Sequence, residues 1–172
     1  MTKTCAIIGC SPMCFPWGFD EEDEGCAALK LILINQISKL RGEGYMRFAV
    51  SMDCGGGLYA AEILHGLKES DGALETICYV PCEEQATKWT PELRNRYFNA
   101  LAVCTEVVNV AYEKTVGCGF KAYLEAMNEA DAVIAIYDPE DPLCERETAA
   151  VAVAEMLNRQ VLTVDPKAIR LF

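Results

Sequence analysis

The sequence predicts a doubly wound α/β fold, with a mostly parallel, Rossmann-like sheet and helices on both faces. Six short apolar runs are each followed by a loop, and helix-like stretches lie between them. Because the runs are continuous rather than alternating, they indicate strands buried on both faces, and the stretches between them are the crossovers that parallel strands need. The predicted strands are Thr4–Gly9, Met46–Met52, Leu74–Pro81, Glu106–Ala111, Asp131–Asp138 and Gln160–Pro166.

Helix-like stretches alternate with these strands. The first has an apolar pattern compatible with a well-buried helix, and Gly42 and Gly44 after it can supply a left-handed C-terminal turn. Five helices are predicted. The first two cover residues 25–41 and 58–68, and the last covers residues 145–157. The third begins near Pro91, a favourable first-turn residue, and the fourth ends near Glu129. Sheets of this kind bind ligands outside the carboxyl ends of their strands, where the strand order reverses.

Length, composition and charge limit the class of protein. The 172 residues fit one domain over residues 1–172, and we also expect a homo-oligomer. No apolar run reaches the roughly 20 residues of a membrane helix, and no basic leader precedes the first strand, so we expect a cytoplasmic protein without a membrane partner. The net charge of −11 disfavours duplex nucleic acid as a partner. The acidic run Asp20–Glu24 is interpreted as a solvated helix N-terminus, with a divalent-metal site as the alternative.

Ten cysteines raise the question of zinc or disulfides. None forms a Cys-x-x-Cys motif, the closest spacings are Cys10/Cys14 and Cys78/Cys82, and Cys5 and Cys78 lie inside predicted strands. With one histidine in the chain, a Cys/His zinc site is not expected, and we predict reduced, mostly buried thiols. Cys10 has the best case for reactivity, because a helix N-terminus lowers a thiol's pKa, and an inert thiol is the alternative.

A glycine cluster, Gly55-Gly56-Gly57, lies between the second predicted strand and its helix. Backbone N–H groups in such a loop can bind a phosphate, but the same glycines can simply make a tight turn. Both interpretations stay open at this stage.

Several longer segments recur, in this order, in one protein family. They are Phe15–Glu21, the run from Met52 through Gly55 to Glu62, Pro81–Gln85 with Trp89, Arg94–Tyr97, Ala130–Asp138 and Val164–Pro166. Together they resemble the YspA/YpsA-like branch of the SLOG superfamily, Rossmann-like proteins related to the LOG nucleotide phosphoribohydrolases and to the DNA-processing protein DprA. The resemblance covers nearly the whole chain. It implies a pocket for a nucleotide derivative, such as ADP-ribose or an NAD-like ligand, lined by the loops after the first, second, fourth and fifth strands.

The chain departs from this family pattern at anion-binding positions. It has Gly9-Cys10-Ser11-Pro12 in place of Gly-His-Arg-Pro, Gly57 in place of an aspartate, Ala122-Tyr123 in place of an Arg-Asn pair, and Leu143-Cys144-Glu145 near a Gly-Gly-Thr loop. The lost arginines, together with acidic residues near the last of these loops, predict a rim that repels anions. Those acidic residues are Glu140, Asp141, Glu145 and Glu147.

Other candidate side chains keep two interpretations each. Glu62 is either a pocket carboxylate or a helix-surface group with a pairing partner. Trp17 and Trp89 either stack on a base or pack under a loop. Arg94 and Arg96 point to different faces of one helix, so only one of them easily faces a site.

We expect a divergent protein that binds or senses a small nucleotide-derived ligand, without clear catalytic machinery and without a required cofactor or metal ion. One alternative is an N-glycosidase-like phosphoribohydrolase in which Glu62 or Glu145 assists cleavage. Another is a protein–protein adaptor with a vestigial pocket. Glu62 is the candidate catalytic residue, and the predicted ligand-binding residues are Gly9, Cys10, Ser11, Pro12, Trp17, Gly55, Gly56, Gly57, Glu62, Glu84, Gln85, Trp89, Arg94 and Asp138.

Overall fold

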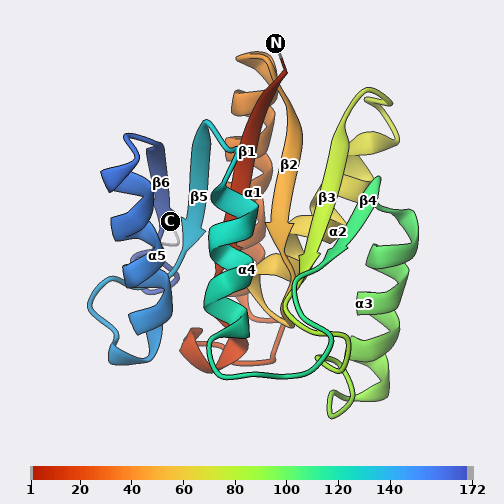
Figure 1. The fold of residues 1–172 in the computed structure, drawn as a ribbon, viewed down its shortest axis with the longest axis vertical. Coiled ribbons are helices and arrows are strands. Elements are labelled where there is room, and N and C mark those ends of the chain that lie inside the picture. The colour runs from red at the N-terminus through yellow and green to blue at the C-terminus, as the bar shows by residue number, and fades with distance from the viewer. Residues whose placement is uncertain (1, 170–172) are drawn as a thin grey trace.

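A computed structural model describes residues 2–169, and its centre is a six-stranded, entirely parallel sheet (Figure 1). The strand order is β4-β3-β2-β1-β5-β6. The strands are β1 (Lys3–Gly9), β2 (Tyr45–Ser51), β3 (Glu75–Val80), β4 (Glu106–Asn109), β5 (Ala132–Ile136) and β6 (Gln160–Val164). All six predicted strands are confirmed, with ends that differ by at most two residues.

Helices cover both faces of this sheet. They are α1 (Glu24–Gly42), α2 (Gly56–Lys68), α3 (Pro91–Val103), α4 (Cys118–Met127) and α5 (Glu145–Met156), with short 3-10 turns η1 (Pro12–Cys14) and η2 (Pro142–Cys144). In Figure 1, α4 and α5 lie in front of the sheet, whereas α1 and α2 lie behind it and α3 packs on α2. The predicted doubly wound, Rossmann-like α/β fold is therefore confirmed.

Strand order reverses between β1 and β5. The chain passes from β1 through β2 and β3 to β4 in one direction, then returns to place β5 on the other side of β1. The carboxyl ends of the strands lie at the lower edge of the sheet in Figure 1. The loops after β1 and β5 therefore meet at the topological switch point, where open α/β sheets bind ligands.

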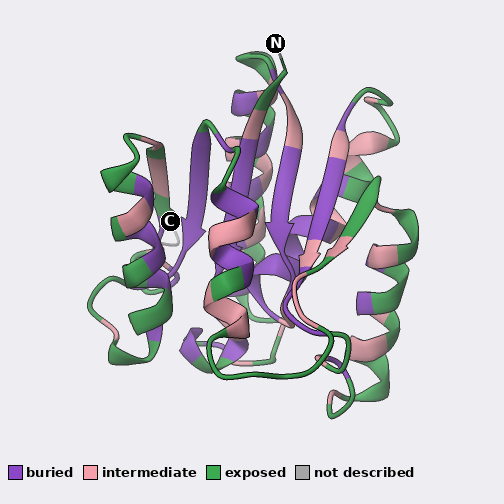
Figure 2. Cartoon of the chain, viewed as in Figure 1, coloured by how far each residue is buried: buried purple, intermediate pink, exposed green. Residues whose placement is uncertain are grey.

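Burial distinguishes the central strands from the edge strands (Figure 2). All of β5 and the last five residues of β1 are buried, but β4 has three exposed residues of four and β6 has one buried residue of five. The prediction that all six runs are buried on both faces was therefore wrong for the two edge strands. An edge strand has a neighbour on one side only, and no helix covers the outer part of β4 as closely as α4 covers β1 (Figure 2).

The acidic run before α1 is confirmed as a helix N-terminus. The Asp23 carboxylate caps α1 by accepting a hydrogen bond from the Gly25 N–H at 2.7 Å. Glu21 forms ion pairs with Lys30 and Arg96, at 2.7 Å and 2.5 Å. Within residues 2–169, no helix combines the length and the apolar character needed to cross a bilayer.

Candidate functional site

A large cleft opens at the carboxyl edge of the sheet. Its volume is about 1290 Å³, and it is lined by residues that follow β1, β2, β3, β4 and β5. The wall nearest the sheet contains Ser51 and Met52, both buried. The loop from Lys114 to Gly119 and the start of α5 line other parts of the cleft. This is the place that the strand order and the resemblance both indicated, with the loop after β3 added.

Four of the predicted ligand-binding residues line the cleft: Ser11, Glu84, Gln85 and Trp89. The Gln85 side-chain amide donates a hydrogen bond to the Met52 carbonyl at 3.0 Å, which fixes the loop after β3 against the end of β2. Trp89 is partly buried and packs edge-to-face on Tyr97, with ring centroids 5.0 Å apart. Trp89 therefore offers an aromatic surface that is held in place from behind.

The other predicted ligand-binding residues lie outside the cleft lining: Gly9, Cys10, Pro12, Trp17, Gly55, Gly56, Gly57, Glu62, Arg94 and Asp138. Trp17 is only 9 % exposed and stacks on Phe15 at 4.9 Å, which in turn stacks on Tyr59. The interpretation of Trp17 as packing under a loop is the one that this geometry supports.

Glu62 belongs to an ion-pair cluster away from the cleft. Arg96 donates hydrogen bonds to both carboxylate oxygens of Glu62, at 3.1 Å and 2.6 Å, and also to Glu21. Arg94 donates instead to the Thr87 carbonyl at 3.4 Å. Glu62 thus connects α2 to α3 and to the segment before α1, and this geometry gives it a structural rather than a catalytic position.

Asp138 also has structural contacts. Its Oδ1 accepts a hydrogen bond from the Glu140 N–H at 2.9 Å, and its Oδ2 lies 3.1 Å from the Lys167 Nζ. Lys167 pairs with Asp141 as well, at 2.9 Å. The charge of this loop is therefore partly neutralised by a lysine from the segment after β6.

The glycine cluster after β2 is filled by a side chain of the same loop. The Asp53 Oδ1 accepts hydrogen bonds from the N–H groups of Gly55 and Gly57, at 2.6 Å and 3.1 Å. The Gly56 N–H donates to the Cys10 carbonyl at 3.3 Å. Because these donors are occupied, the phosphate-loop interpretation of Gly55-Gly56-Gly57 was wrong, and Asp53 holds the position that an external anion would need.

Close packing explains why glycine is required at these positions. A Cβ at Gly57 would lie 2.1 Å from the Ser51 carbonyl oxygen, and one at Gly55 would lie 2.7 Å from the Cys10 carbonyl oxygen. A Cβ at Gly9 would lie 3.3 Å from the Gly56 Cα. The glycines therefore allow the N-terminus of α2 to approach the ends of β1 and β2.

The N-terminus of α4, rather than that of α2, lines the cleft. Gly117, Cys118 and Gly119 line it, Gly117 has a φ of 84°, and no side chain of the described residues caps the N-terminus of α4. The Arg146 guanidinium lies against Gly119, since a Cβ there would be 2.4 Å from its Nη1. The sequence analysis did not predict this arrangement, although Gly117 and Gly119, at the start of a predicted helix, could have indicated it.

Cations line the cleft alongside acids. The cleft lining contains Lys88, Lys114 and Arg146, and none of these three forms an ion pair with a residue that the structure describes. The exposed acids of the lining are Glu84 and Glu145. Of the four acids predicted to form an anion-repelling rim, Glu145 is exposed on the cleft lining and Glu147 lines the cleft but is buried. Asp141 pairs with Lys167, and neither Asp141 nor Glu140 lines the cleft. The rim therefore carries both signs of charge.

Two carboxyl groups at the cleft wall have unusual environments. Burial raises the pKa of Asp53 to about 7, against the opposing effect of the Gly55 and Gly57 N–H groups. Burial also raises the pKa of Glu147, which is 5 % exposed. The Asp53 Oδ2 and the Glu147 Oε2 are both buried and have no hydrogen-bond partner among the described residues.

Tyr123 contacts Glu147 at the cleft wall. Its hydroxyl lies 2.6 Å from the Gly9 carbonyl oxygen and 3.0 Å from the Glu147 Oε1, and its one proton can be donated to either of them. A hydrogen bond to Glu147 lowers the pKa of that carboxyl, but burial is the larger effect and raises it. Tyr123 occupies a position where the family resemblance placed a polar residue, and it now links β1, α4 and α5.

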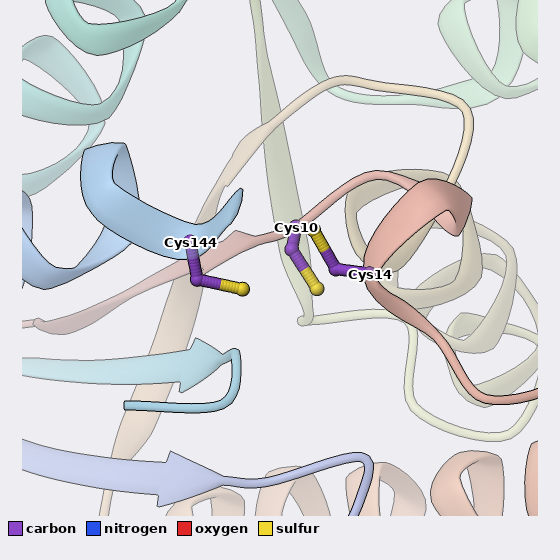
Figure 3. A group of neighbouring side chains, drawn as sticks. All are labelled: Cys10, Cys14 and Cys144. Atoms are coloured by element: carbon purple, nitrogen blue, oxygen red, sulfur yellow. The ribbon is translucent and has the colours of Figure 1, made fainter. Parts of the chain in front are cut away.

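Three thiols meet at the switch point. The Sγ atoms of Cys10, Cys14 and Cys144 all lie within 4.8 Å of one another. Figure 3 shows the three side chains close together; Cys10 follows β1, Cys14 belongs to η1, and Cys144 ends η2 just before α5. Cys10 is fully buried, and burial raises its pKa well above the usual range. The interpretation of Cys10 as a reactive thiol was therefore wrong, because its environment favours the neutral form.

The parallel sheet, its reversal between β1 and β5 and the cleft at that point define a Rossmann-like α/β protein with a ligand-sized site. A sequence model of the YspA SLOG family matches residues 5–166, and the chain belongs to this family. The resemblance inferred from the motifs is thereby confirmed.

Two relatives agree with this assignment. The chain is 30% identical over 142 residues to a UPF0398 protein of Bacillus licheniformis, covering 80% of this chain and 76% of the relative. It is 26% identical over 129 residues to a UPF0398 protein of Halalkalibacterium halodurans, covering 72% and 67% of the two chains.

Proposed function

We propose that the cleft binds a small nucleotide-derived ligand and that the protein acts as a binding or sensing protein. The observation that carries this proposal is the combination, in one cleft at the switch point, of a supported aromatic face and cations that form no ion pair with a described residue. Trp89 supplies the face. Lys114, before α4, and Arg146, on α5, supply the cations, and the start of α4, which no described side chain caps, lines the same cleft.

Each part matches one part of such a ligand. A base stacks on an aromatic side chain with a gain of about 1–3 kcal/mol. A phosphate accepts hydrogen bonds from a helix N-terminus and from Arg or Lys. The cleft volume of about 1290 Å³ is above the roughly 300–1,000 Å³ of ordinary small-molecule pockets, so it has room for a ligand as large as ADP-ribose or NAD.

The test is a thermal-shift series followed by titration calorimetry, with AMP, ADP-ribose, NAD and cyclic nucleotides as probes. A ligand at about 100 times its dissociation constant stabilises the folded state by roughly 2.7 kcal/mol, which raises the melting temperature by about 5–10 °C for a chain of this length. We expect at least one phosphate-bearing probe to do so.

Two variants locate the site. Trp89→Leu and Arg146→Ala should each weaken binding of that probe by about fivefold or more, because each removes a contact worth at least about 1 kcal/mol. Lys121→Ala is the matched control, since Lys121 lies on α4 outside the cleft lining and faces Glu125 at 4.0 Å. No shift with any probe would contradict the proposal and favour a protein–protein adaptor with a vestigial pocket.

An N-glycosidase-like hydrolase is the second candidate, and one observation favours it. Asp53 lines the cleft, its pKa is raised to about 7, and its Oδ2 has no partner among residues 2–169. A carboxyl group with a pKa near neutral pH is suited to general acid–base catalysis. Chromatography of nucleotide incubations for free base tests this: release that is lost in Asp53→Asn would support it, and no release would exclude it.

A further inference from the structure

We infer that Cys10, Cys14 and Cys144 form a binding site for a single thiophilic metal ion, with Zn²⁺ as the best fit. The three thiols come from three separate segments that meet where β1 and β5 diverge. Figure 3 shows the side chains of Cys10, Cys14 and Cys144 close together. The site does not depend on the nucleotide proposal.

The spacing of the sulfur atoms fits one ion. Tetrahedral coordination with Zn–S bonds of about 2.3 Å places sulfur atoms about 3.8 Å apart. The three Sγ atoms lie within 4.8 Å of one another, so shifts of less than about 1 Å per atom bring them to that geometry. An iron–sulfur cluster is larger and is ordinarily held by four cysteines, so three sulfurs this close fit a mononuclear ion better.

Thiols at this separation also occur as ordinary van der Waals neighbours, so a second observation is needed. The Glu147 Oε2 is buried, has no hydrogen-bond partner among the described residues and belongs to a side chain that is 5 % exposed. Glu147 follows Cys144 by three residues, one turn along α5, and its carboxyl group is among the charges that raise the pKa of both Cys10 and Cys14. An unsatisfied buried oxygen beside the thiols is expected if a water on the ion donates a hydrogen bond to it.

The surroundings favour a divalent ion over Cu⁺. Three thiolates carry three negative charges. A divalent ion offsets more of this charge than a monovalent one, and thiolates suit both. Cys14 and Ser11 line the cleft, so solvent can reach a fourth coordination position from that side. Three cysteine ligands with one open position is an arrangement that zinc adopts.

The experiment uses full-length, freshly reduced protein under anaerobic conditions, with Co²⁺ as the probe and Zn²⁺ as the competitor. We expect one Co²⁺ per chain, with intense near-ultraviolet absorption from thiolate-to-cobalt charge transfer, as each bound thiol releases its proton to solvent. One equivalent of Zn²⁺ should abolish this absorption. Native mass spectrometry should then show a single zinc adduct.

Variants decide whether this cluster is the site. Cys14→Ser and Cys144→Ser should each weaken Co²⁺ binding by more than about 100-fold, beyond the 10- to 100-fold cost of losing an outer-shell contact. Cys54→Ser and Cys82→Ser are the matched controls, because both thiols line the same cleft outside the cluster, and they should change the affinity by less than about threefold. If Cys144→Ser does not fold, Cys14→Ser carries the test, since Cys14 lies on the cleft wall.

Two results would overturn the inference. One is the absence of charge-transfer absorption in wild-type protein at saturating Co²⁺. The other is unchanged absorption and affinity in the folded Cys14→Ser variant, which would place the metal at other thiols, such as Cys82 and Cys118.

Discussion

The loops that start α2 and α4 look alike in sequence and differ in what their N–H groups contact. Both follow a strand of the sheet and both contain closely spaced glycines. In the α2 loop, Asp53 and the Cys10 carbonyl accept the hydrogen bonds of Gly55, Gly56 and Gly57. The start of α4 lines the cleft and has no side-chain cap among the described residues, although the Cys118 N–H donates a hydrogen bond to the Thr115 carbonyl at 3.2 Å.

This difference shows that a glycine cluster can be required by packing rather than by a ligand. The glycines of the α2 loop let two backbones approach within van der Waals contact, whereas Gly119 makes room for the Arg146 side chain. The α2 loop is therefore closed by its own contacts, whereas the α4 loop lines the cleft.

The largest expected effect separates the two loops directly. Gly57→Ala should lower the free energy of unfolding by more than about 4 kcal/mol, because the new Cβ would lie 2.1 Å from the backbone oxygen of Ser51, which cannot move alone. Gly119→Ala should cost less than about 1 kcal/mol, because its Cβ meets only the flexible end of Arg146 and alanine favours the helix. Urea denaturation measures both, and equal losses would contradict the comparison.

Asp53 gives the α2 loop a pH dependence. Its folded-state pKa of about 7 exceeds the ordinary value of 3.8, so the stability it contributes is fully present below pH 3.8 and is lost as the pH rises to 7. Asp53→Asn keeps an oxygen for the Gly55 and Gly57 N–H groups and removes the titration. From pH 5 to pH 8, wild type should lose on the order of 3 kcal/mol more than this variant.

Glu147 contributes to the same pH dependence. Its raised pKa acts in the same direction in both proteins. Its charge is also one of the causes that raise the pKa of Asp53, so the difference between the two proteins includes the interaction between these two groups. Denaturation curves at the two pH values give the result, and parallel pH profiles for the two proteins would show that Asp53 ionises normally in the folded state.

Most of the fold was predictable because it depends on short-range patterns. Continuous apolar runs such as that of β5, fully buried in the structure, and the loops between them place each strand and helix to within about two residues. The exposure of β4 was not predictable in the same way. Its two valines favour a strand, but Glu106 and Asn109 do not, and the strand order puts it at an edge.

The candidate site was predictable in place but not in detail. The carboxyl ends of the strands were indicated correctly, and Trp89 was recognised as a candidate that does line the cleft. Arg146 and the thiol cluster were missed, because residues far apart in sequence meet there. Cys144 lies next to Cys10 and Cys14 only after β5 has paired with β1.

Arg96 is expected to matter to α2 rather than to the cleft. It holds Glu21 and Glu62 together, with side chains 23% and 39% exposed, and removing it leaves two carboxylates facing each other. Arg96→Leu should therefore cost about 2 kcal/mol of unfolding free energy, while Glu62→Gln should cost less than about 1 kcal/mol because Arg96 keeps Glu21. Nucleotide affinity should stay unchanged in both folded variants. A loss of affinity in Glu62→Gln would show that Glu62 contributes to ligand binding.

The smallest expected effect on ligand affinity concerns Lys114, in the loop before α4. Lys114 lines the cleft beside the start of α4 and is exposed, so Lys114→Ala should weaken binding of a phosphate-bearing probe by about two- to fivefold, as expected for an exposed charge contact. The effect should shrink as salt is raised, because exposed charges are screened over about 10 Å at 0.1 M and about 3 Å at 1 M. Lys121→Ala, outside the cleft on the same side of the sheet, should show neither effect. Calorimetric titrations at two salt concentrations measure this, and a loss that did not depend on salt would mean that Lys114 shapes the loop instead of attracting the ligand.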